Sequence, residues 1–110
     1  MPPGSEVMTP QLKEQFEMRY AATQRSTTSS YLKLLPKAMS MELAFLRAGG
    51  VLLAGTDPTG GGGVIPGFSD QRAIELLVEA GLSPLEAIRV GTLNGATYLG
   101  RADKVGSLAT

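Results

Sequence analysis

One short apolar run, Val-Leu-Leu-Ala-Gly at residues 51–55, constrains the fold of this 110-residue chain more than any other feature. Two glycines precede the run, and Thr-Asp-Pro follows it at residues 56–58. A continuous apolar run of this length between turn residues is typical of a strand buried on both faces of a parallel sheet. Because parallel strands are connected through helices, the run predicts an α/β fold with helices on both flanks.

Helical patterns surround this predicted strand. The clearest is at Ser83, which forms a capping box with Glu86 and has proline at the first helical position. Residues 23–30 are polar and rich in hydroxyl groups, which is typical of a linker, and residues 105–108 resemble the start of a second strand. Apolar spacing, caps and glycine stops together predict helices over residues 10–22, 39–48, 69–80 and from Ser83 to a break at Asn94.

A single strand cannot form a sheet, so the predicted α/β fold needs further strands. The chain either takes strands from a partner or belongs to a larger protein. Its length allows at most one folding unit over residues 1–110. Within that unit, residues 31–110 carry the strand, a glycine-rich loop and the later helices, whereas residues 1–30 hold a helix and linker without a clear place in the fold.

Charge and composition exclude several classes of function. Lys plus Arg and Asp plus Glu each number 10, so no net charge attracts nucleic acid or an anionic membrane. The chain has no signal-peptide pattern and no apolar run of membrane-spanning length, which predicts a soluble chain of otherwise undetermined location. It contains no cysteine and no histidine, which excludes disulfides, thiolate metal sites and a Ser-His triad.

Asp57 is the residue best placed for chemistry. It follows the C-terminal end of the predicted strand, where functional groups gather in parallel α/β folds. A carboxylate at that position can bind a divalent metal or accept a proton from water. The alternative is that residues 56–58 are only a turn, and spacing alone favours the turn.

The glycine-rich loop is a second candidate. Thr59, Gly60, Gly61, Gly62 and Gly63 open a segment in which the backbone has unusual conformational freedom. An active-site loop and a plain connector are equally consistent with this composition. A phosphate-binding βα unit is a weaker third option. The glycine run has no Gly-x-Gly-x-x-Gly spacing and is not followed by the Lys-Ser/Thr pair that ends a phosphate-binding P-loop.

Several motifs in a fixed order resemble the C-terminal part of the amidohydrolase superfamily, and most closely its imidazolonepropionase-like branch. The resemblance extends from about Met39 to the end of the chain, and five matching motifs in order are far more specific than one glycine loop. The motifs are Phe45-Leu-Arg-Ala-Gly-Gly-Val-Leu-Leu-Ala-Gly-Thr-Asp-Pro58, Ile65-Pro-Gly-Phe-Ser-Asp70, Glu75-Leu-Leu-Val-Glu-Ala-Gly-Leu-Ser-Pro-Leu-Glu-Ala-Ile-Arg89, Thr92-Leu-Asn-Gly-Ala96 and Val105-Gly-Ser-Leu108.

This resemblance implies a fold and a chemistry. It implies a partial (β/α)₈ TIM barrel of the metal-dependent hydrolase type, in which residues 51–55 form the last barrel strand. It implies that Asp57 binds a divalent metal, most commonly zinc, and helps to activate the water that hydrolyses a C–N bond in a small amide or cyclic amide. Residues 59–68 would then rim the mouth of the active site and contact the substrate.

Departures from the family pattern limit what this chain does alone. The family's histidine ligands have no counterpart here, and a full barrel takes on the order of 250 residues. The chain also ends within a motif. We therefore expect a fragment that is inactive by itself and that depends on the rest of the barrel or on a homo-oligomer. The alternative function is a non-enzymatic helical interaction module derived from such a barrel.

Overall fold

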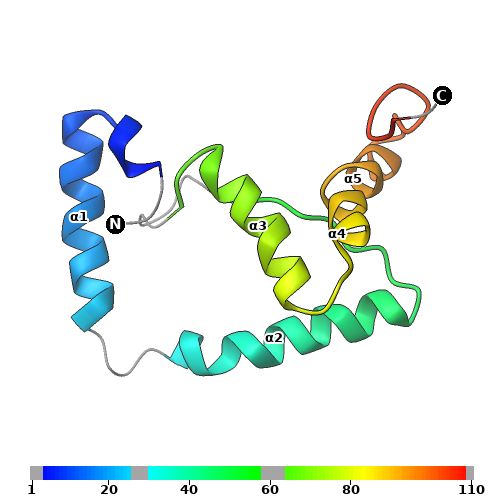
Figure 1. The fold of residues 1–110 in the computed structure, drawn as a ribbon, viewed down its shortest axis with the longest axis horizontal. Coiled ribbons are helices and arrows are strands. Elements are labelled where there is room, and N and C mark those ends of the chain that lie inside the picture. The colour runs from blue at the N-terminus through cyan, green and yellow to red at the C-terminus, as the bar shows by residue number, and fades with distance from the viewer. Residues whose placement is uncertain (1–3, 26–29, 58–63, 109–110) are drawn as a thin grey trace.

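The computed structural model describes residues 4–25, 30–57 and 64–108, and the regular elements in these stretches are helices (Figure 1). No strand occurs in the described stretches, and no helix in them has the length and apolarity needed to cross a membrane. In chain order the elements are the 3₁₀ helix η1 (Ser5–Val7), α1 (Pro10–Arg25), α2 (Ser30–Arg47), α3 (Phe68–Glu79), α4 (Pro84–Gly91) and α5 (Leu93–Tyr98).

The predicted fold class, an α/β partial TIM barrel containing the last barrel strand, is therefore wrong for the structure observed. Residues 51–55 are not part of a sheet. They run between the helices as an irregular segment without a helical turn. A strand is defined by hydrogen bonds to a neighbouring strand. No other described part of the chain supplies such a neighbour, and residues 105–108 form a bend followed by irregular chain instead of the predicted second strand.

The helix predictions are confirmed, although several boundaries differ. The first helix, α1, continues to Arg25, three residues beyond its predicted end. The helix predicted after Pro36 begins at Ser30, so that the proline lies inside α2. Proline removes one helical hydrogen bond, and the helix continues because the remaining peptide groups of α2 are still paired. The Ser40 hydroxyl also donates to the Pro36 carbonyl oxygen (2.9 Å).

Glycines and caps end the helices as their sequence signals predict. Gly49 and Gly81 follow α2 and α3 with φ of 91° and 111°, the left-handed region that glycine adopts at little cost. Ser83 caps α4 in a complete capping box. The break before α5 falls at Thr92, with φ of −132°, and not at the predicted Asn94. A break was predicted correctly, but its position was wrong. Gly95 lies inside α5.

The buried core is small and lies where α3, α4 and the segment of residues 51–57 meet. Figure 1 shows α3 and α4 beside this segment, with α2 running past them and α1 apart at the other end of the molecule. Phe16 is buried and stacks on Tyr20 of the same helix, with ring centroids 6.0 Å apart. The main core consists of Leu77, Leu82, Ala87 and Val90, with Leu43, Leu46, Leu52, Ala54 and Ile74 packed against it.

Candidate functional site

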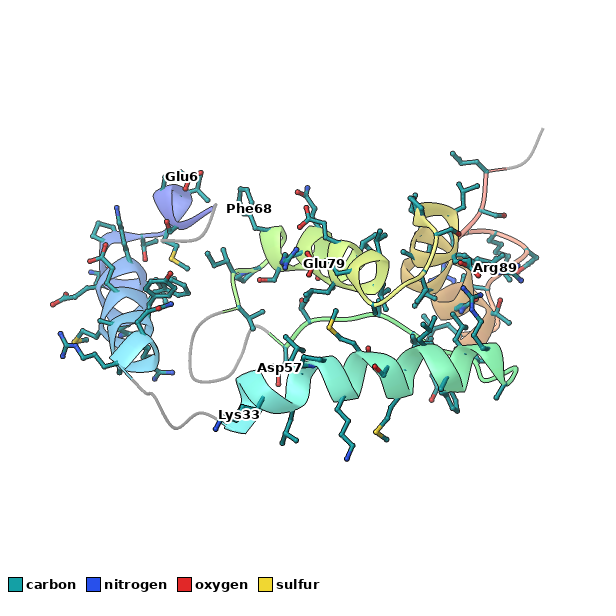
Figure 2. All side chains as sticks on the ribbon, turned by 60° about the horizontal axis from the view of Figure 1, so that its bottom comes forward. Glu6, Lys33, Asp57, Phe68, Glu79 and Arg89 are labelled. Atoms are coloured by element: carbon teal, nitrogen blue, oxygen red, sulfur yellow. The ribbon has the colours of Figure 1, made fainter. Side chains whose placement is uncertain are left out.

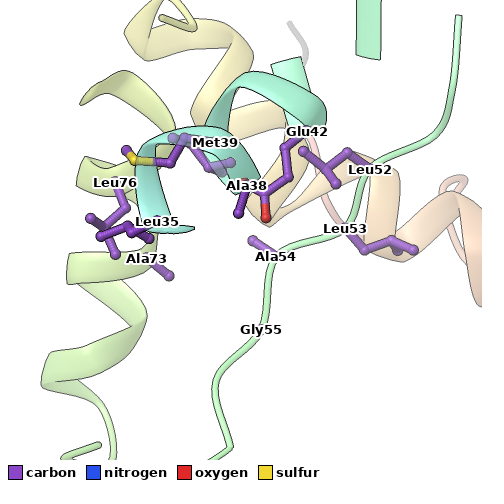
Figure 3. A pocket seen from close by; sticks show the side chains of 11 residues that line it. Leu35, Ala38, Met39, Glu42, Leu52, Leu53, Ala54, Gly55, Ala73 and Leu76 are labelled. Carbon is purple, nitrogen blue, oxygen red and sulfur yellow. The ribbon is translucent and has the colours of Figure 1, made fainter. Parts of the chain in front are cut away.

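Asp57 lies at the end of a segment in which exposure alternates residue by residue. The side chains of Leu52, Ala54 and Thr56 are partly buried, whereas Leu53 and Asp57 are exposed. Figure 3 shows Leu52 and Ala54 on one side of the ribbon and Leu53 on the other. Side chains that alternate between two sides with a period of two residues are characteristic of an extended chain. This alternation places Asp57 on the solvent-facing side, opposite the side that packs on the helices.

Two side-chain hydrogen bonds hold this extended segment. Near its start, the Asn94 side-chain amide of α5 donates to the Leu52 carbonyl oxygen (2.8 Å). At its end, the Thr56 hydroxyl donates to Oδ1 of Asp70 in the first turn of α3 (2.7 Å). The segment is therefore attached to α5 at one end and to α3 at the other, and Asp57 follows directly after the second attachment.

A pocket of about 210 Å³ lies between the segment, α2 and α3 (Figure 3). Its walls are mostly leucine and alanine side chains, and Glu42 is the only ionisable residue among those that line it. Ligand sites combine an apolar wall with several converging polar groups. This pocket lacks that combination, and Asp57 does not line it, so we do not assign the chemistry of the chain to it.

The described residues do not fit a complete metal centre. No group of three or more His, Cys, Asp and Glu side chains comes together within them, and the full chain contains neither histidine nor cysteine. Structural and catalytic zinc sites use three or four protein ligands. Asp57, shown in Figure 2 just before the segment drawn in grey, therefore offers one carboxylate, and its assignment as a metal ligand stays a prediction.

The glycine-rich loop contains the other candidates predicted from the sequence. Thr59, Gly60, Gly61, Gly62 and Gly63 lie outside the described residues, so their role as a substrate loop also stays a prediction.

The glutamates of α3 belong to a solvated face. The guanidinium of Arg72 contacts Glu75 at 3.0 Å and Glu79 at 2.6 Å, and all three side chains are at least half exposed. Exposed pairs of this kind stabilise a helix only slightly. They form no site for chemistry.

Glu86 joins two elements in a way that the sequence did not reveal. Its carboxylate accepts hydrogen bonds from the Ser83 backbone N–H (2.8 Å) and from both terminal nitrogens of Arg47 on α2. The Arg47 hydrogen bond, followed by those from Ser83, lowers the pKa of Glu86 to about 2. The same pairing raises the pKa of Arg47. The site is structural, since it ties the end of α2 to the start of α4.

Sequence patterns also missed the contacts that hold the extended segment. Asp70 lies in the first turn of α3, and Asn94 was predicted to mark a helix break. Asp70 also accepts a hydrogen bond from Thr56, and Asn94 donates one to Leu52, so both residues make contacts far along the chain. No local signal encodes such bonds, because helix-terminal polar residues usually satisfy neighbouring backbone groups.

Comparison with known proteins identifies one matching family. The model of a family described as "Amidohydrolase family" matches residues 8–110. This match covers α1 as well as the later helices, and so extends over residues that the motif resemblance did not reach. No curated protein and no solved structure matches the chain.

Proposed function

This chain belongs to the amidohydrolase family, and from that membership we propose that it forms part of a hydrolase that cleaves a C–N bond in a small amide or cyclic amide. The observation that supports this most directly is the position of Asp57. It is exposed at the end of an extended segment whose other face is packed against the helices. A carboxylate at such a position lies on the surface, where a substrate or a ligand supplied from outside the chain can approach it.

The proposal includes dependence on groups that this chain lacks. Enzymes of the family generally bind divalent metals, and we propose zinc for the complete enzyme. The described residues do not form a metal centre, so the remaining ligands have to come from elsewhere in the assembly. We accordingly propose that the chain is a fragment that is inactive alone and that the parent enzyme belongs to the imidazolonepropionase-like branch.

The test is to purify the chain with its natural partners and to assay a panel of small linear and cyclic amides. Asp57→Asn preserves the size of the side chain but removes its charge, and we expect it to lower the hydrolysis rate by on the order of 100-fold or more. Asp103→Asn, on an exposed turn near the C-terminal end of the described residues, is the matched control and should leave the rate unchanged. Equal rates for both variants and the unmodified assembly would overturn the proposal.

A second function is favoured by a different observation, the exposed apolar surface. Leu85, Tyr98, Leu99 and Leu108 are each at least two-thirds exposed, on and after α4 and α5. Large exposed apolar side chains often mark protein contacts. In the interaction-module alternative, the purified assembly lacks hydrolytic activity, and Leu85→Glu prevents assembly whereas Asp57→Asn does not.

A further inference from the structure

We propose that the uncovered face of α4 binds an amphipathic helix of a protein partner, and that this helix carries a carboxylate side chain that pairs with Arg89. The inference concerns the partner of the exposed apolar surface described above and does not depend on the proposed hydrolysis. It is supported by the two apolar faces of α4, by a groove along the uncovered face, and by the charge at that groove.

α4 has apolar side chains on two opposite faces. Ala87 and Val90 are 0% and 2% exposed and pack in the core. Leu85 and Ile88 are 80% and 50% exposed, and at about 100° per residue they lie on the side of the helix opposite to the core residues. A surface helix normally has one apolar face, and a helix that is apolar on more than one face is covered on each of them. The uncovered face therefore indicates a missing contact.

The uncovered face of α4 opens on an apolar groove. The side chains of Leu85, Ile88, Leu93 and Leu108 line this groove of about 560 Å³, between α4, the start of α5 and the chain after α5. Ile88 and Arg89 lie three and four residues after Leu85, the spacing of the side-chain ridges by which helices pack on one another. An amphipathic helix lays its apolar face into such a groove, with anchors at the same spacing.

Arg89 is the only charged residue among those that line the groove. It makes no ion pair within the described stretches, whereas Arg47 and Arg72 each do. The nearest acidic neighbour of Arg89 in the sequence is Glu86, whose carboxylate is hydrogen-bonded to Arg47. Figure 2 shows Arg89 at the end of the molecule opposite α1. The groove thus combines apolar walls with one cation whose intrahelical partner is already occupied.

The charge of Arg89 selects the chemistry of the partner. Covering the groove takes water away from this cation, and a cation that loses water without gaining an anion opposes binding. A carboxylate at the edge of the partner's apolar face removes this penalty and can accept two hydrogen bonds from the guanidinium. A second copy of the chain does not supply it through the same face, because the described residues that line its groove include another Arg89 and no acidic residue.

The experiment measures the binding of designed helical peptides to the full chain by fluorescence anisotropy. Each peptide carries leucines on one face and one glutamate at the edge of that face, and the set moves the glutamate along the peptide so that no register is assumed. We expect the best peptide to bind at least about tenfold more tightly than its counterpart with glutamine. Arg89→Gln should remove this difference, while Leu85→Gln should weaken both peptides by about tenfold or more.

Arg25→Gln and Val7→Gln are the matched controls. Arg25 is an exposed arginine of α1, and Val7 in η1 is 70% exposed, so each control loses the same kind of group at the other end of the molecule (Figure 1). Both controls should bind the peptides as the unmodified chain does. Leu85 and Arg89 are themselves exposed, so circular dichroism should show the same helix content in all four variants.

Three binding results would show that the inference is wrong. They are that no peptide of the set binds, that the glutamate and glutamine peptides bind equally, or that the preference for glutamate survives in Arg89→Gln. Sedimentation that shows a dimer of the chain, dissociated by Leu85→Gln, would also overturn it, because a second copy would then cover this face of α4.

Peptide binding is separable from the proposed function, because the measurement involves no hydrolysis. An assembly that hydrolyses amides through Asp57, formed by a chain that binds none of the peptides, would contradict this inference alone. Peptide binding that depends on Arg89, in a chain whose assembly hydrolyses no amide, would support this inference and contradict only the proposed function.

Discussion

At Gly106 the backbone has a conformation that no other residue adopts easily. Its φ is 95°, in the left-handed region, and a Cβ added there would lie 2.6 Å from the Ala96 Cβ and 3.0 Å from the Leu93 Cα. The residue thus combines backbone strain with a close approach to α5. Gly100, with φ of 66°, has the first property without the second, since nothing lies within 4 Å of its added Cβ.

These two glycines give a prediction at the scale of the residue. Gly106→Ala should lower the free energy of unfolding by roughly 2 kcal/mol or more, because both strain and a backbone collision are introduced. Gly100→Ala should cost about 1 kcal/mol, since only the positive φ is unfavourable. Urea denaturation followed by circular dichroism measures both, and equal losses would mean that the collision with α5 is relieved by movement of the chain after residue 100.

At the scale of the element, the junction of α2 and α4 depends on the charge of Glu86. The pKa of Glu86 is lowered from its usual value of 4.5 to about 2 because of the hydrogen bonds from Arg47 and Ser83. A carboxyl with a lowered pKa in the folded state stabilises that state above its unfolded pKa, and the stabilisation is lost as the pH falls through the folded pKa. The sensitive window is therefore between about pH 4.5 and pH 2.

Glu86→Gln tests this pH dependence. Glutamine retains the capping-box interaction with Ser83 but has no charge for Arg47. The difference in unfolding free energy between the unmodified chain and the variant should shrink as the pH is lowered through that window. Arg47→Gln should remove the part of the pH dependence that comes from the ion pair. A difference independent of pH from 6 to 2 would contradict the assignment.

At the scale of the whole molecule, stability depends on one small cluster. Leu82 is only 3% exposed and packs with Leu77, Ala87 and Val90, whereas Leu85, three residues later, is 80% exposed. A chain with so few buried side chains has little reserve, because folded domains are stable by only about 5–15 kcal/mol.

Leu82→Ala should cost roughly 2–5 kcal/mol through lost burial and the cavity left behind. That loss is comparable with the stability of a small domain, so we expect most of the chain to be unfolded at 25 °C. Leu85→Ala is the matched control and should change the unfolding free energy by less than about 0.5 kcal/mol. Circular dichroism and hydrogen exchange distinguish the two. Equal stability of both variants would show that the cluster around Leu82 is not the core.

Local features of this protein followed from its sequence. The capping box at Ser83 and the glycines that end α2 and α3 were predicted and observed, because each depends on hydrogen bonds or φ values within a few neighbouring residues. The amidohydrolase family was likewise recognisable from the order of its motifs and was confirmed by the family match. Asp57 was predicted to follow a buried strand, whereas it follows an extended segment that belongs to no sheet in the described stretches, and its chemical role stays a prediction.

Only the tertiary structure decided what that extended segment does. Whether residues 51–55 form a strand depends on a hydrogen-bonded neighbour, and none exists in the described stretches. Its attachments join Thr56 to Asp70, 14 residues away, and Leu52 to Asn94, 42 residues away. The hydrogen bond between Arg47 and Glu86 likewise joins residues 39 apart. Such contacts form only when the intervening chain folds back, which depends on the packing of all the elements together and not on any short sequence pattern.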